Sequence, residues 1–198
     1  MIMRQAIRSG IVAGICCCGT GYGEAAQVTR VDAPPPAYAD MEASSSVTLP
    51  EPSPTARTLC VTLRLDAAQT NQAEFALGTG TGHGPDGAAL VAGWDRGGWF
   101  VRCDRLRRHF AADTANPAAS GPRALEVRVR FAPDGTPVSV AFEADGIPVA
   151  LGGPDAASLP EWLGPGGWDA LRVTARGGAG NVSAEAGFIA DGTRLIVR

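Results

Sequence analysis

Apolar and polar residues alternate along most of the chain after Thr58. In Leu59–Leu65 and again in Arg123–Phe131, every second side chain is apolar, and the residues between are mostly charged or small. A period of two places the apolar set on one face of a β-strand, so both segments are predicted to be strands with one buried face. In the first of them Cys60 falls on the face opposite the leucines.

The stretch Ala88–Cys103 reads AALVAGWDRGGWFVRC and predicts a β-hairpin. Asp and paired Gly between two apolar runs are typical of a tight turn, because glycine adopts the positive φ that such turns need. A four-residue turn at Asp95–Gly98 sets Trp94 opposite Trp99, Ala92 opposite Val101 and Leu90 opposite Cys103. Opposed side chains share one face of a sheet, so both tryptophans are expected in the core.

The remaining pattern predicts an all-β fold. Asp145-Gly146 and Asp191-Gly192 are turn signals between apolar runs, and one helical turn is expected within Ala156–Leu163. Short strands at this spacing, with little helical periodicity, indicate an antiparallel β-sandwich of the jelly-roll or concanavalin-like type. Further strands are expected at Glu74–Gly78, Arg107–Ala112, Val138–Ala144, Ile147–Leu151, Ala170–Ala175, Val182–Ile189 and Thr193–Val197.

The composition divides the chain into three parts. Residues 1–26 resemble a signal peptide, with arginines before a short apolar run that is too short for a stable membrane span. A lipoprotein signal at Cys16–Cys18 is the alternative, although Ile15 fits it poorly. Residues 27–57 are rich in Pro and Ser and are predicted to be a disordered tether, with Ser46–Leu49 as a candidate edge strand. Residues 58–198 form the sandwich domain, and an extracytoplasmic location follows.

Two motifs suggest a family resemblance. GWDRGGWFVR at Gly93–Arg102 and WDALRVTARGG at Trp168–Gly178 resemble an uncharacterised group of exported bacterial proteins with a GWD-x-G-x-W hairpin. That resemblance implies export and a β fold, and it implies no site. The order of the strands also resembles concanavalin-like sandwiches of the laminin-G and lectin type, an analogy of fold alone.

Cys60 and Cys103 are the two cysteines beyond the predicted signal. In an exported domain a pair of cysteines suggests a disulfide. The predicted faces disagree, however, since Cys60 lies opposite the leucines of its strand and Cys103 lies on the tryptophan face of the hairpin. A disulfide between them and two buried thiols both remain open.

The polar residues show no catalytic or metal-binding pattern. The glycine-rich loop at 78–87 has Asp86 as its one carboxylate, so Asp86 is the single candidate calcium ligand, where calcium needs several. His83 and His109 lack partners at zinc spacing and are expected to be ordinary surface residues. No pair of carboxylates follows the strand pattern of sandwich glycosidases. No cofactor and no enzymatic activity are therefore expected.

The tryptophans of the loop at 162–168 are the candidate ligand-binding residues. Trp162 and Trp168 flank a Gly-Pro-Gly-Gly run, where an exposed ring could stack on a sugar. Arg102, Arg105, Arg107 and Arg108 are predicted to form a solvated face, and the net charge of -3 argues against nucleic acid as a partner.

The predicted function is a non-catalytic, exported binding or structural protein of the cell envelope. Its partner is unknown, and a carbohydrate or another envelope protein are the candidates. A lectin-like carbohydrate-binding module is the alternative, and a degenerate glycosidase-like sandwich is the second alternative.

Overall fold

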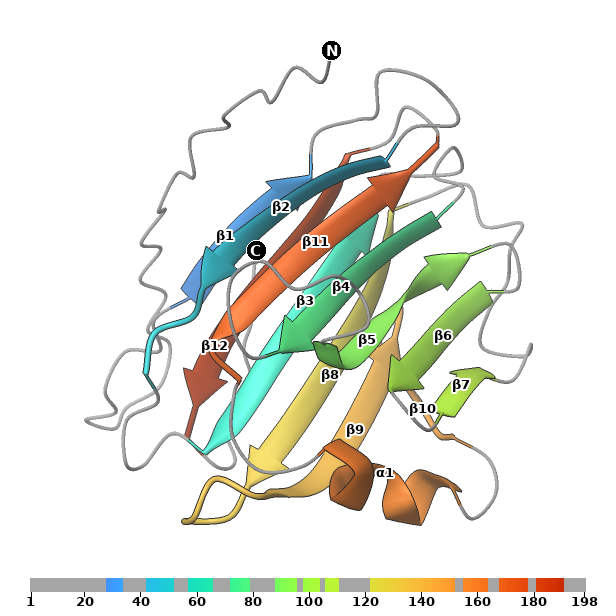
Figure 1. Cartoon of the computed structure of the whole chain (residues 1–198). Helices are drawn as coiled ribbons and strands as arrows, with labels where there is room; N and C mark the ends of the chain where they lie inside the picture. Colours follow the sequence, from blue (N-terminus) through green and yellow to red (C-terminus); the bar gives the residue numbers. More distant parts are fainter. Residues whose placement is uncertain are drawn as a thin grey trace.

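The strands form two six-stranded antiparallel sheets, and the apolar faces of the two sheets pack against each other (Figure 1). The computed structural model describes residues 28–33, 42–51, 57–65, 72–78, 88–95, 98–103, 106–110, 122–151, 155–163, 168–177 and 181–190. The predicted antiparallel β-sandwich is confirmed.

Sheet A and sheet B each combine a meander with strands from distant parts of the chain. Sheet A has the spatial order β1 (Val28–Ala33), β12 (Val182–Ile189), β3 (Thr58–Leu65), β8 (Arg123–Phe131), β9 (Pro137–Ala144) and β10 (Ile147–Val149). Sheet B has the order β2 (Glu42–Thr48), β11 (Ala170–Arg176), β4 (Gln72–Gly78), β5 (Ala88–Asp95), β6 (Gly98–Cys103) and β7 (Leu106–His109). The helix α1 (Asp155–Leu163) packs against β9.

The predicted hairpin is present as β5 and β6, with the expected register. Trp94 lies opposite Trp99 and Ala92 opposite Val101, and Gly98 has a φ of 107° at the turn. Trp99 is fully buried, Trp94 is partly buried against the core, and the two rings meet edge to face at 5.2 Å between centroids. The alternation along the strand therefore placed the aromatic pair correctly.

The predicted boundary between tether and domain needs correction. Two strands come from residues 27–57: β2, which overlaps the candidate edge strand, and β1, which was not expected. β1 pairs with β12 in sheet A, and β2 pairs with β11 in sheet B. Val31 and Ala33 are buried in the core and anchor this short strand. The predicted signal at residues 1–26 lies outside the described residues.

The predicted last hairpin, with its turn at Asp191-Gly192, stays a prediction. β12 lies between β1 and β3, and both of its edges are hydrogen-bonded along the strand. The predicted turn and the returning strand at Thr193–Val197 lie outside the described residues.

No helix in the described ranges is long and apolar enough to cross a membrane.

Candidate functional site on the outward face of sheet B

Strand alternation brings polar side chains from four neighbouring strands together on the outward face of sheet B. The register sets Phe100 opposite His109, and Arg102 opposite Arg107. On the other side Glu74 lies opposite Gly93, two residues before Asp95. We call the following group the outer polar cluster: Glu74, Asp95, Arg102, Arg107 and His109.

Asp95, the last residue of β5, pairs with two side chains of the edge strand β7. His109 Nε2 lies 2.7 Å from Asp95 Oδ1, and Arg107 Nη2 lies 3.8 Å from Asp95 Oδ2. The carboxylate is largely buried, whereas the side chains of Arg107 and His109 are 63% and 39% exposed. The carboxylate thus orients one guanidinium and one imidazole that remain open to solvent.

Glu74 and Arg102 form a second ion pair beside the first. Arg102 Nη2 lies 3.6 Å from Glu74 Oε1, and Gln72 Nε2 donates to Glu74 Oε2 at 3.3 Å. Glu74 is only 5% exposed, although it points away from the core. The glycine at position 93 makes this possible, because a Cβ there would lie 2.1 Å from the Ala73 carbonyl oxygen and 2.7 Å from the Glu74 Cα.

Three apolar side chains lie next to these polar groups on the same face of sheet B. Ala76, Val91 and Phe100 form a cluster separate from the main core, and we call it the outer apolar cluster. The Phe100 ring meets the His109 ring edge to face, with centroids 6.0 Å apart. The imidazole is therefore held from two sides, by an aromatic ring and by a carboxylate.

This arrangement offers fixed hydrogen-bonding groups to a bound molecule. Carboxylate, guanidinium and imidazole groups lie side by side and offer both acceptors and donors in fixed positions. An Asp–His pair could orient a nucleophile. The outward positions described on β5, β6 and β7, however, carry no hydroxyl or thiol. Within the described ranges no group of three His, Cys, Asp or Glu side chains could hold a metal ion.

The loop tryptophans lie elsewhere, and Trp168 is not an open platform. Trp168 is 7% exposed and packs edge to face against Phe131, with ring centroids 5.4 Å apart. Trp162, near the end of α1, is partly buried against the same core. The prediction of an exposed Trp168 is therefore wrong, because the apolar ring is used in closing the core. Trp162 stays a prediction.

Other predicted residues fall outside this face or outside the described residues. His83 and Asp86 lie outside the described residues, as does Arg105. Arg108 lies opposite Val101 and so points to the inner face.

Cys60 and Cys103 are free and buried, so the alternative of two buried thiols is the one found. They belong to different sheets: Cys103 packs in the core, whereas Cys60 faces outward beside Glu126 and Arg128. Burial raises the pKa of the Cys60 thiol to about 12, and the nearby Glu126 carboxylate adds to the shift. The opposed faces predicted from the alternation explain why no bond forms.

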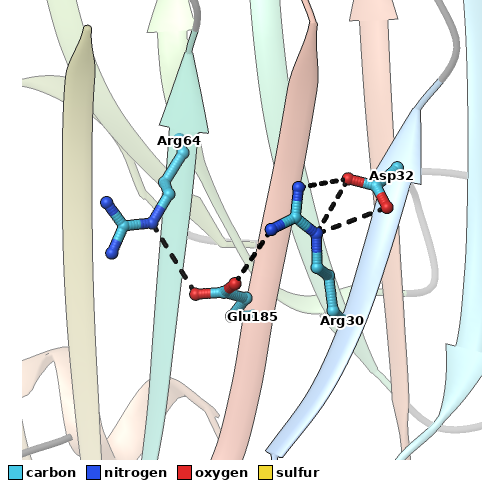
Figure 2. Close-up of polar contacts among 4 residues, drawn as sticks. All are labelled: Arg30, Asp32, Arg64 and Glu185. Carbon is cyan, nitrogen blue, oxygen red and sulfur yellow. Dashed lines mark hydrogen bonds and ion pairs between the residues drawn. The ribbon is translucent and has the colours of Figure 1, made fainter. Parts of the chain in front are cut away.

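The outward face of sheet A also carries charged side chains, and these form ion pairs between neighbouring strands. Figure 2 shows Glu185 of β12 between Arg30 of β1 and Arg64 of β3, with nitrogen–oxygen distances of 3.3 and 3.6 Å. Arg30 also pairs with Asp32 at 2.9 Å, and this hydrogen bond raises the pKa of the Arg30 guanidinium. Glu185 is nearly buried, so the network fastens the edge strand to its neighbours.

Sequence reasoning missed the outer polar cluster. It assigned Asp95 to a turn, Arg102, Arg107 and His109 to the solvated surface, and Glu74 only to a strand. The signal was present in the parity of the strands: once β5, β6 and β7 are aligned, Asp95, Arg107 and His109 all point outward. Finding it required the pairing of β6 with β7, which is not visible in either strand alone.

Comparison with known proteins gives similarities of fold. No protein-family model matches the chain, and no curated protein matches it. A tetrameric galectin from the ball sponge Cinachyrella sp. is 13% identical, with a TM-score of 0.41, over 73% of this chain and 99% of the galectin. A CBM2 module from the Dit protein of Lactobacillus casei BL23 phage J-1 is 10% identical, with a TM-score of 0.47, over 82% and 78% of the two chains. Winged bean acidic lectin is 9% identical, with a TM-score of 0.45, over 83% and 88%.

These similarities concern the arrangement of strands in a sandwich, and no residue role is transferred from them. The resemblance to the exported GWD-x-G-x-W group stays a prediction.

Proposed function

We propose that this protein is a non-catalytic binding protein that recognises a carbohydrate through the outer polar cluster. One observation carries the proposal: Asp95 holds His109 at 2.7 Å and Arg107 at 3.8 Å on the outward face of an edge strand, with both partners exposed. Export of the protein remains part of the proposal, and it rests on the predicted signal.

The chemistry of the cluster fits a polyhydroxylated ligand. A sugar presents neighbouring hydroxyl groups that each donate and accept a hydrogen bond, and Asp95 beside Arg107 offers an acceptor and a donor together. The ring of His109 adds a flat surface for the C–H face of a sugar. Because the strand pairing and the Phe100 ring already fix these groups, little conformational entropy is lost on binding.

A glycan array with the purified protein tests the proposal, followed by titration of any sugar that binds. Substitution Arg107→Ala is expected to weaken binding by roughly tenfold or more, since a charge-assisted hydrogen bond contributes about 1.5–3 kcal/mol. The matched control is Arg130→Ala, an exposed arginine on β8 of sheet A. Asp95→Asn should weaken binding too, because its two partners lose their anchor.

Two results would overturn the proposal. One is the absence of binding to every glycan by a folded protein. The other is an affinity that Arg107→Ala and Arg130→Ala change equally.

A further inference from the structure

Polar side chains continue from the outer polar cluster across sheet B toward its other edge strand, β2. Arg176 of β11 lies opposite Glu42 of β2 on one side and opposite Gln72 of β4 on the other. The pairing of β4 with β5, extended by one residue, sets Gln72 level with Asp95. Residues opposite one another point to the same side of a sheet, so these four side chains share the outward face. We call Glu42, Arg176 and Gln72 the β2–β4 polar row.

The β2–β4 polar row repeats the chemistry of the outer polar cluster. Arg176 Nε donates to Glu42 Oε2 at 2.6 Å, and in the cluster Arg107 pairs with Asp95. Each place therefore holds a carboxylate beside a guanidinium, which is an acceptor next to a donor. Gln72 lies between the two places, and its side-chain amide has both a donor and an acceptor. Two similar groups on one face suit a ligand that presents the same chemical groups more than once.

The Glu42–Arg176 pair is more exposed than the ion pairs that join strands in sheet A. The side chain of Glu185 in sheet A is 6% exposed, whereas those of Arg176 and Glu42 are 46% and 47% exposed. An exposed ion pair contributes little to stability, because water competes for both charges. The pair is therefore accessible to a bound molecule, and a substitution there is expected to leave the fold intact.

The width of the sheet determines the size of a ligand that contacts both places. Neighbouring strands lie about 4.8 Å apart, so β2 is separated from β5 by roughly 14 Å and from β7 by roughly 24 Å. A single sugar ring is much smaller than either distance. A chain of linked sugars that runs across the strands is long enough to contact Glu42 and Asp95 together.

The charges on this surface are balanced, which favours a neutral ligand. Glu42 lies beside Arg176, and Asp95 lies beside Arg107. An acidic chain would be attracted by each arginine and repelled by the carboxylate next to it. The hydroxyl groups of a neutral chain can donate to the carboxylate and accept from the guanidinium without separating the pair.

We infer that the β2–β4 polar row is a second binding subsite and that the ligand is a neutral, linear oligosaccharide lying across the strands from β7 to β2. This inference rests on the proposed function, because it extends the site formed by the outer polar cluster. The cluster binds the first sugar units. Gln72 and the Glu42–Arg176 pair bind units farther along the same chain, so the affinity depends on chain length.

Calorimetric titration with oligosaccharides of increasing chain length tests the inference. The neutral series are the linear oligosaccharides of starch, cellulose and chitin, together with a series built on any glycan that binds on the array, and oligogalacturonate is the acidic series. Affinity is expected to rise by roughly tenfold or more from the shortest neutral member that binds to the longer members, because the longer chains gain charge-assisted hydrogen bonds.

Three arginine variants assign this gain to a place on the sheet. Arg176→Ala is expected to remove most of the gain and to leave the affinity for the shortest member unchanged. Arg107→Ala should weaken short and long chains alike. The matched control, Arg130→Ala, should change neither, since Arg130 is an exposed arginine on β8 of sheet A. Thermal unfolding shows whether each variant is folded.

The results that would overturn this inference differ from those that would overturn the proposed function. An affinity that does not rise with chain length would remove the second subsite and leave the proposed function in place. Retention of the full gain by Arg176→Ala, or equal weakening of short and long chains, would do the same. Tighter binding of oligogalacturonate than of every neutral series would refute the neutral ligand. If no glycan binds at all, the inference and the proposed function fail together.

Discussion

The ion pair between Arg123 of β8 and Asp145 in the turn between β9 and β10 lies within sheet A, and it holds a guanidinium that reaches Trp94 of sheet B. Its removal is the sharpest test of the packing. Arg123 Nε and Nη2 both lie 2.7 Å from Asp145 Oδ2. The guanidinium also lies over the Trp94 ring, 4.8 Å from its centroid, and the Arg123 side chain is 9% exposed. Asp145→Ala removes the carboxylate and leaves this positive charge buried.

The expected cost follows from burial and from the backbone. Breaking a buried pair by removing one partner costs about 3–5 kcal/mol, and Asp145 is 30% exposed, so the lower end of that range applies. Asp145 also has a φ of 51°, where alanine costs about 1 kcal/mol more than aspartate or asparagine. We therefore expect Asp145→Ala to lower the free energy of unfolding by about 4 kcal/mol. In a domain of this size that is a fall of roughly 10 °C in Tm.

Two further variants separate the charge from the backbone. Asp145→Asn keeps the tolerance of positive φ and an acceptor for the Ala124 N–H, which Asp145 Oδ1 accepts at 2.9 Å. It is expected to cost about half as much. Arg123→Leu leaves a carboxylate that water can reach, so it should cost about 1 kcal/mol, and the double variant should cost less than the sum of the single variants.

Urea unfolding followed by tryptophan fluorescence measures these differences, because Trp94 and Trp99 both face Arg123. A coupling energy of about 2 kcal/mol between Asp145→Ala and Arg123→Leu is expected. Costs that add to within about 0.5 kcal/mol would show that the pair does not stabilise the fold, and the reasoning would be refuted.

Two further predictions concern Cys60 and Gly93. The folded-state pKa of about 12 at Cys60 lies above the unfolded value near 9, so its contribution to stability is complete below pH 9 and is lost as pH rises toward 12. Thermal unfolding of the wild type should therefore show a steeper fall in Tm between pH 8 and pH 10.5 than Cys60→Ala, and equal slopes would contradict the prediction. Gly93→Ala places a Cβ 2.1 Å from the Ala73 carbonyl oxygen and should lower stability by about 2–3 kcal/mol in urea. Gly135→Ala, where φ is +82° and nothing lies within 4 Å, should cost about 1 kcal/mol, so a similar loss at both positions would refute the close approach.

The alternation of apolar and polar residues predicted the strands, because this alternation is set by residues close together in the sequence. Arg123–Phe131 and Val182–Ile189 were predicted with the bounds they have in the structure. The Trp94–Trp99 register followed from one turn, and the outward position of Cys60 followed from parity. β1 escaped prediction because VTRVDA has only two buried positions, and its partner β12 is about 150 residues away in the sequence.

By itself the sequence determined the class of the fold, the bounds of most strands and the face on which each side chain lies, since a period of two is a local property of the chain. Only the tertiary structure decided which strands are neighbours. That choice brings Glu74, Asp95, Arg102, Arg107 and His109 from four strands onto one surface. It also places β12 between two other strands and closes Trp168 into the core. Pairing between distant strands depends on how the whole set of apolar faces packs, and no short stretch of residues contains that information.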